Sequence, residues 1–191
     1  WNWAFVRMAE LYLLKEDLAG AEAILFQIQR DLGDNMTLFT PLIMAFEPKL
    51  AMARGEYAEA EALARRYQTL EEWGLHAFVP ELRCQLGRAL LAQGRDDEAH
   101  AVLAEARRAA ERLGARRLLW PILAALAEVA ARVGGDGAAA AESLRAQAAA
   151  IVAYIAGQAG SDDLRASFLA QPHVRAVLDA RGPRRGDEPP A

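Results

Sequence analysis

Residues 56–63 read EYAEAEAL, and a related pattern of small, apolar and acidic residues stands at 17–24 as DLAGAEAI and at 95–102 as RDDEAHAV. The interval from the first of these copies to the second equals the interval from the second to the third, and a looser fourth copy follows Gly135. A unit that recurs at this spacing predicts a stack of helical hairpins, in which each hairpin buries its apolar face against its neighbours.

Glycines divide the helix-forming sequence into segments. Glycine adopts the left-handed conformation that ends many helices, so we expect helices to stop near Gly33, Gly55, Gly74, Gly94 and Gly114. No stretch alternates polar and apolar residues as a half-buried strand would, and the fold class is therefore all-α. The segments predict hairpins at about 2–33, 36–73, 75–113 and 115–157, a two-helix cap at 161–181, and a disordered tail at 182–191.

Small residues recur early in the second helix of each expected hairpin. Alanine at these positions lets two helices approach closely, and the copies supply Ala21, Ala60, Ala99 and Ala140. Pro48 lies outside the repeating proline positions of the chain, and it predicts a kink or a late helix start in the second hairpin.

Composition narrows the class of protein. The 191 residues are 53% hydrophobic with a net charge of −4, which excludes a disordered chain and argues against a nucleic-acid binder held by phosphate contacts. No apolar run is long enough for a membrane helix. The single Cys84 rules out an internal disulfide and favours a reducing, cytoplasmic location. The chain opens without an initiator methionine and reads as a fragment of a longer protein.

Catalytic motifs are missing from the sequence. His76, His100 and His173 are far apart and lack the spacing of a metal site. Cys84 would need a base beside it to act as a nucleophile, and we interpret it as a thiol that is packed or faces the groove. Gly134-Gly135-Asp136-Gly137 lacks the pattern of a nucleotide-binding loop and is interpreted as a linker. We therefore expect a protein that is not an enzyme and that needs no cofactor and no metal.

The third copy carries small and large residues at set positions, namely Leu86-Gly87, Leu90, Gly94, Glu98-Ala99, Leu103 and Ala106. In these positions it resembles a tetratricopeptide repeat, although its period of about 39–41 exceeds the usual length of roughly 34 residues. The longer hairpin, and the ending at 163–178, are similar to the helical-repeat region that closes large bacterial signalling ATPases, LuxR-type regulators and cyclase- or kinase-ATPase fusions. The resemblance implies a right-handed α-solenoid of four antiparallel hairpins with a two-helix cap.

In tetratricopeptide hairpins the first helices line a concave groove, and this implies where a ligand would bind. Phasing the four copies places Glu10, Lys49, Arg88 and Val129 at one equivalent position. We expect Lys49 and Arg88 to bracket a carboxylate or an acidic peptide. Arg7 and Arg132 lie nearby in phase. The apolar residues that flank these positions suit the packing of another domain of the same polypeptide equally well, and they are Trp3, Leu42, Phe46, Met52 and Leu126.

The function expected from these features is a non-catalytic interaction or regulatory scaffold, the docking or sensor array of a bacterial multidomain signalling ATPase. Its partner would be a protein, a peptide or an upstream domain, and neither a nucleic acid nor a membrane. A second hypothesis is a sensor in which groove residues and Arg88 enclose a small metabolite. The edge formed by Trp1, Trp3 and Phe5 could also let two copies associate.

Overall fold

The structure, a computed structural model, describes residues 2–32, 40–133 and 137–180. Throughout these ranges the regular elements are helices and no strand occurs, so the all-α prediction is confirmed. Trp1, most of the expected 134–137 linker and the expected tail at 182–191 lie outside the described residues.

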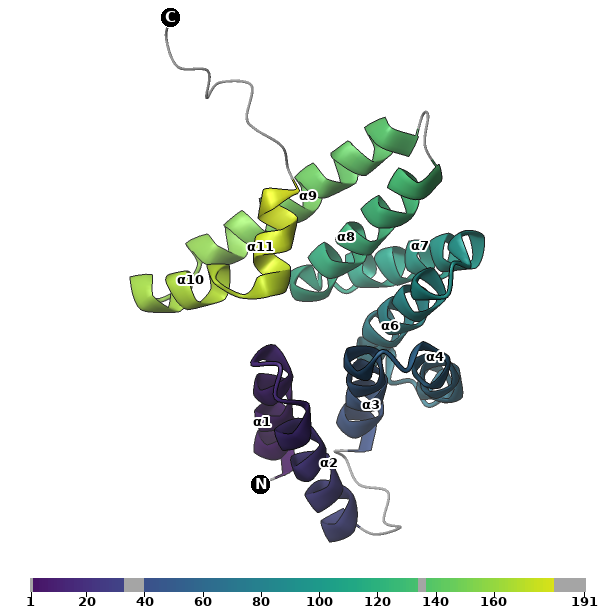
Figure 1. The fold of residues 1–191 in the computed structure, drawn as a ribbon, viewed down its shortest axis with the longest axis vertical. Helices are drawn as coiled ribbons and strands as arrows, with labels where there is room; N and C mark the ends of the chain where they lie inside the picture. The colour runs from purple at the N-terminus through teal and green to yellow at the C-terminus, as the bar shows by residue number, and fades with distance from the viewer. Residues whose placement is uncertain (1, 33–39, 134–136, 181–191) are drawn as a thin grey trace, which may run out of the picture. The chain divides into compact units, whose positions relative to one another are not determined.

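The chain divides into two compact units, residues 1–109 and 110–191 (Figure 1). Helices α1–α6 and the short η1 belong to the first unit, and α8–α11 belong to the second, while α7 runs across the boundary. The bounds are α1 (Asn2–Leu14), α2 (Leu18–Leu32), α3 (Thr40–Arg54), α4 (Tyr57–Arg66), α5 (Thr69–Glu72), η1 (His76–Phe78), α6 (Val79–Ala92), α7 (Asp96–Arg112), α8 (Arg116–Val133), α9 (Gly137–Gly157), α10 (Asp162–Leu169) and α11 (Pro172–Asp179).

Helix ends fall where glycine permits a left-handed backbone. Gly55, Gly74, Gly94 and Gly114 all have positive φ, between 61° and 76°, and each follows the end of a helix. Glu16 takes the same conformation, with φ of 59°, in the turn between α1 and α2. It stands one repeat before Gly55, so this turn keeps its shape even where the repeat lacks glycine.

In the first unit, neighbouring helices pack through several apolar clusters. α3 sets Ile43, Phe46 and Leu50 against Val6, Ala9, Leu25 and Ile28 of α1 and α2. Ala51 and Ala60 bring α3 and α4 together with Ala89 of α6. Each helix pair therefore rests on the pair that precedes it in the chain.

Alanine and glycine residues allow these helices to approach each other closely. Ala21, Ala60 and Ala99 are fully buried, as expected. A Cβ atom added to Gly87 on α6 would lie 2.5 Å from Cγ of Leu103 on α7, so only glycine admits this leucine. In the fourth copy the prediction was one residue out of register, because Ala141 is buried and Ala140 is exposed.

Two further details differ from expectation. α3 begins at Thr40 and continues through Pro48, whose side chain is fully buried, so the late helix start was wrong. The second expected hairpin is interrupted after Arg66, and the short α5 follows. The interruption lets Tyr67 and Leu70 pack with Leu82 of α6.

The second unit is built on α9. α8 lies alongside α9, and α10 and α11 pack against the same helix (Figure 1). Trp120, Val152 and Val174 belong to its apolar core. Ser161 caps α10 by accepting a hydrogen bond from the backbone N–H of Leu164, and Pro172 begins α11.

No helix in the described part of the chain combines the length and the apolar character needed to cross a bilayer.

Candidate functional site

Lys49 on α3 stands at the centre of a charged junction in the first unit. Its Nζ lies 2.8 Å from Oε1 of Glu10 on α1 and 2.5 Å from Oε1 of Glu81 on α6. Arg7 contacts the other oxygen of Glu10 at 2.5 Å. The three central side chains are only 14–24% exposed. A single ammonium therefore joins the first helices of three successive copies.

The junction shifts the pKa values of Glu10 and Lys49. Burial alone would raise the pKa of Glu10, but the charges and hydrogen bonds of Lys49 and Arg7 outweigh it and lower that pKa. Burial would likewise lower the pKa of Lys49, whereas Glu81 and Glu10 raise it above its ordinary value. Glu10 and Lys49 are thus both charged at neutral pH, and their pairing is strengthened by partial exclusion of water.

The junction bears on Lys49 and Arg88, the two residues expected to bracket a ligand. The carboxylates that Lys49 contacts come from the chain itself, so a bound carboxylate would have to displace Glu10 or Glu81. Arg88 is exposed on α6, and the described residues supply it with no ion pair. The pairing of Lys49 with Arg88 around an acidic ligand stays a prediction.

Arg132 belongs to the second unit, where its Nη2 lies 3.0 Å from Oε1 of Glu128. Of the four predicted basic residues, the structure therefore brings together Arg7 and Lys49, through Glu10.

Most of the apolar residues expected to flank the groove pack, at least in part, against the core. Leu42 and Phe46 pack in the core between α3 and the first helix pair, and Met52 packs beside Ala51 and Ala60. Leu126 is buried as well. The side chain of Trp3 lies outside the described residues. Phe46 and Leu126 are therefore buried, whereas Leu42 and Met52 are half-buried, and the packing of another domain against them stays a prediction.

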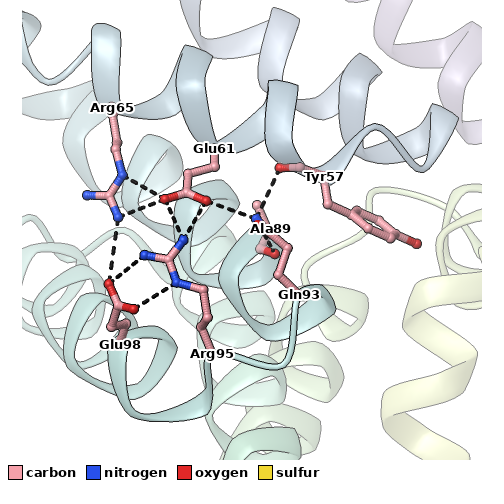
Figure 2. Close-up of polar contacts among 7 residues, drawn as sticks. All are labelled: Tyr57, Glu61, Arg65, Ala89, Gln93, Arg95 and Glu98. Carbon is pink, nitrogen blue, oxygen red and sulfur yellow. Dashed lines mark hydrogen bonds and ion pairs between the residues drawn. The ribbon is translucent and has the colours of Figure 1, made fainter.

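A second polar cluster centres on Glu61 of α4 (Figure 2). Glu61 accepts hydrogen bonds from Arg65, from Gln93 at the end of α6, and from Arg95, which also contacts Glu98 of α7. Burial would raise the pKa of Glu61, but its three donors lower it. The cluster ties the turn between the two helices of one copy to the second helix of the copy before it.

The same connection occurs one repeat earlier. Arg54 at the end of α3 contacts Oε1 of Glu22 on α2 at 2.6 Å. Glu22 and Glu61 are one repeat apart, and so are Arg54 and Gln93. Equivalent residues therefore make equivalent contacts between successive helix pairs.

Sequence reasoning missed a hollow of about 460 Å³ at α5, α6 and α7. At its wall, Nη2 of Arg83 lies 2.8 Å from Glu71 and its Nε lies 3.6 Å from Glu105. The lining residues are Gln68, Glu71, Glu72, Arg83, Val102 and Glu105. Glu71 and Glu105 are 41% and 51% exposed, so the hollow is open to solvent. Its two acidic walls come from separate helices that are distant in sequence, and no local spacing signals such a site.

The surroundings of Cys84 and the arrangement of the possible metal ligands bear on whether the chain carries reactive groups. Burial raises the pKa of Cys84 to about 11, so the thiol is protonated at neutral pH. Among the described residues no group of three or more histidine, cysteine or carboxylate side chains is placed to hold a metal ion. Their buried side-chain nitrogen and oxygen atoms all have hydrogen-bond partners.

No family model matches the sequence, and no curated protein matches it.

Proposed function

We propose that the protein is a non-catalytic interaction scaffold, a right-handed α-solenoid of four helical hairpins with a two-helix cap, which binds a protein or peptide partner. The observation that carries the proposal is the junction at Lys49. Its contacts with Glu10 and Glu81 join α1, α3 and α6, the first helices of three successive copies. Charged side chains are used here to stack repeats, and stacked repeats provide extended surfaces for recognition.

The hollow beside Arg83 is the surface we propose for the partner. Three carboxylates face one guanidinium there, so the lining carries a net negative charge. Arg83 forms ion pairs with Glu71 and Glu105, while Glu72 is exposed and has no ion pair with a described residue. A basic side chain of an extended segment would find a carboxylate at Glu72 and an apolar contact at Val102.

The wider role that we propose is regulatory. The resemblance of the repeats to the closing region of bacterial signalling ATPases and LuxR-type regulators supports a docking or sensor array in a cytoplasmic multidomain protein. Occupation of the hollow would then alter how the array contacts an ATPase or effector domain.

A small metabolite is the second candidate ligand. The hollow of about 460 Å³ is large enough for one, because pockets for small molecules commonly begin at about 300 Å³. The converging charges of Arg83 and the surrounding carboxylates suit a ligand that carries an amine.

The purified chain can be tested with a displayed library of random peptides. We expect enrichment of peptides rich in lysine and arginine, and loss of their binding in Glu72→Lys, which reverses one charge without breaking an ion pair between described residues. Glu142→Lys, at an exposed position of α9 in the second unit, is the matched control. Failure to enrich any peptide, or binding that Glu72→Lys leaves unchanged, would contradict the proposal. Thermal stabilisation by a small amine, abolished by Glu72→Lys alone, would favour the metabolite.

A further inference from the structure

One face of α1 carries apolar side chains that are exposed to solvent. Ala4, Met8 and Leu11 are spaced by four and three residues, so they lie in one row along the helix. Met8 is 38% exposed and Leu11 is 57% exposed. Phe5, which was expected at an exposed edge, instead packs against the core of the first helix pair. We call Ala4, Met8 and Leu11 the α1 row.

The equivalent row of the second copy lies on α3, at Ile43, Glu47 and Leu50. Ile43 and Leu50 are 7% and 4% exposed, because they pack against the preceding helix pair, α1 and α2. Glu47 accepts a hydrogen bond from Gln29 of α2 at 2.7 Å. The row on α3 is therefore the surface through which the second copy rests on the first.

The third copy uses the same row. Its members are Leu82, Leu86 and Ala89 of α6, and all three are buried. Leu82 packs with Tyr67 and Leu70, and Ala89 packs with Ala51 and Ala60 of the preceding copy. Of these three copies, only the first has a row that lacks a covering helix pair among the described residues.

The charged side chain of Lys15 lies close to the end of the α1 row, and its equivalents in the later copies also contact the preceding helix pair. Lys15 is the repeat equivalent of Arg54, which contacts Glu22, and of Gln93, which donates to Glu61 at 2.9 Å. Each of these glutamates lies near the start of the second helix of the preceding pair. Lys15 is exposed and makes no ion pair with any residue that the structure describes.

We propose that the α1 row and Lys15 form a docking surface for one further helix pair of the same repeat type, whose second helix presents a carboxylate to Lys15. The apolar part of this partner would resemble the surface that α1 and α2 offer to α3. The proposal rests on the repeat stacking of the proposed function and does not involve the hollow at Arg83.

A second copy of this chain fits the surface less well. Its Glu22 is held by Arg54, and its Glu61 is held by Arg65, Gln93 and Arg95. The corresponding residue of the third copy is His100, which cannot supply a carboxylate. The chain therefore lacks an unpaired glutamate at the position that would face Lys15 in these copies.

The test is a variant of the full chain in which residues 1–39 are duplicated in tandem at the N-terminus, because this length keeps the repeat register. Glu22 of the added helix pair has no Arg54 in the copy that follows it, because Lys15 of the original first copy stands at the equivalent position. Leu11→Cys in the original first copy then serves as a probe for a thiol reagent, since Cys84 is buried. We expect this thiol to react at least about tenfold more slowly in the duplicated chain than in the single chain.

Phe26→Cys in the original first copy is the control for the reagent. Phe26 is 68% exposed, and its equivalent in the second copy, Arg65, is exposed too, so an added helix pair should leave it reactive. Lys15→Glu in the original copy should restore much of the reactivity at Leu11→Cys. Adding Glu22→Lys in the added copy swaps the two charges, and it should restore the protection of this thiol that Lys15→Glu removed.

Three results would overturn the proposal. The first is equal reactivity of Leu11→Cys in the duplicated and single chains while the added helices are folded by circular dichroism. The second is protection that Lys15→Glu and the charge swap leave unchanged. The third is a dimer of the single chain in sedimentation that Leu11→Glu dissociates, because a second copy would then cover the row. Peptide binding at the hollow is measured separately with Glu72→Lys, so failure here is distinguishable from failure there.

Discussion

Glu10 and Lys49 occupy the same position in two successive copies of the repeat, and their side chains meet at 2.8 Å. Equivalent residues of a repeat usually carry similar side chains, yet here a carboxylate faces an ammonium. The opposite charges stabilise the contact between α1 and α3, and Glu81 extends it to α6. The contact is therefore specific to the order of the copies in this chain.

Removal of the central ammonium should destabilise the first unit. Lys49→Met leaves Glu10 and Glu81 partly buried without their shared partner, and we expect a loss of about 3 kcal/mol in the free energy of unfolding, measured with urea. The triple variant that adds Glu10→Gln and Glu81→Gln removes the unpaired charges and should recover most of the loss. A triple variant less stable than Lys49→Met would contradict this account.

Acid should weaken the same junction. The pKa of Glu10 is lowered on folding, so the unfolded chain binds its proton more readily and the stabilisation is lost as pH falls through the folded pKa. Wild type should exceed Glu10→Gln in free energy of unfolding near neutral pH. The difference should shrink as pH falls below the ordinary glutamate value of 4.5.

Urea unfolding of both proteins between neutral pH and about pH 3 measures this difference, since the window must extend below the unfolded carboxyl pKa. Glu142→Gln, at an exposed position of α9 with no ion pair to a described residue, is the control and should show no such gap. A gap between wild type and Glu10→Gln that stays constant across the range would show that Glu10 does not contribute through its charge.

The turn after α1 offers a test of backbone strain. Glu16 has φ of 59°, a conformation that costs an L-residue about 1 kcal/mol and that glycine adopts readily. Glu16→Gly should therefore raise the midpoint of thermal unfolding. Gly94→Ala, at the equivalent turn with φ of 76° and open space around it, should lower the midpoint. Opposite signs at these two positions are the expected result, and equal signs would refute it.

Gly87 should resist substitution for a different reason. A methyl group there would lie 2.5 Å from Leu103, so we expect Gly87→Ala to cost about 1–3 kcal/mol in the free energy of unfolding, despite the helix preference of alanine. Gly157 ends α9 with nothing within 4 Å of an added Cβ, and Gly157→Ala should not destabilise the chain.

A double-variant cycle separates the steric cause. In the presence of Leu103→Ala the added methyl group has room, so Gly87→Ala should cost much less than in the wild type. Additive losses in the two single variants would place the effect of Gly87 elsewhere.

The sequence predicted the helices because helix ends are set by local chemistry. Gly55 and Gly94 end their helices through the left-handed backbone, and Ser161 caps α10 through a contact with the backbone of Leu164. The buried alanines Ala21, Ala60 and Ala99 were found by their spacing, since a repeated contact leaves a repeated small residue. The fourth copy lacks this strict spacing, and the prediction there missed the buried Ala141 by one residue.

The candidate site depended on contacts between segments far apart in the chain. Phasing placed Glu10 and Lys49 at one equivalent position of successive copies, but it did not predict their contact. That contact, and the approach of Glu81 from α6, require the packed positions of three helices. The hollow requires α5 to turn away from α4 after Arg66 and the side chain of Arg83 to reach both Glu71 and Glu105. Periodicity gives the face of a helix on which a residue lies, whereas the identity of an ionic partner depends on the distance between helices. That distance is set by the side chains packed between them, which only the tertiary structure decides.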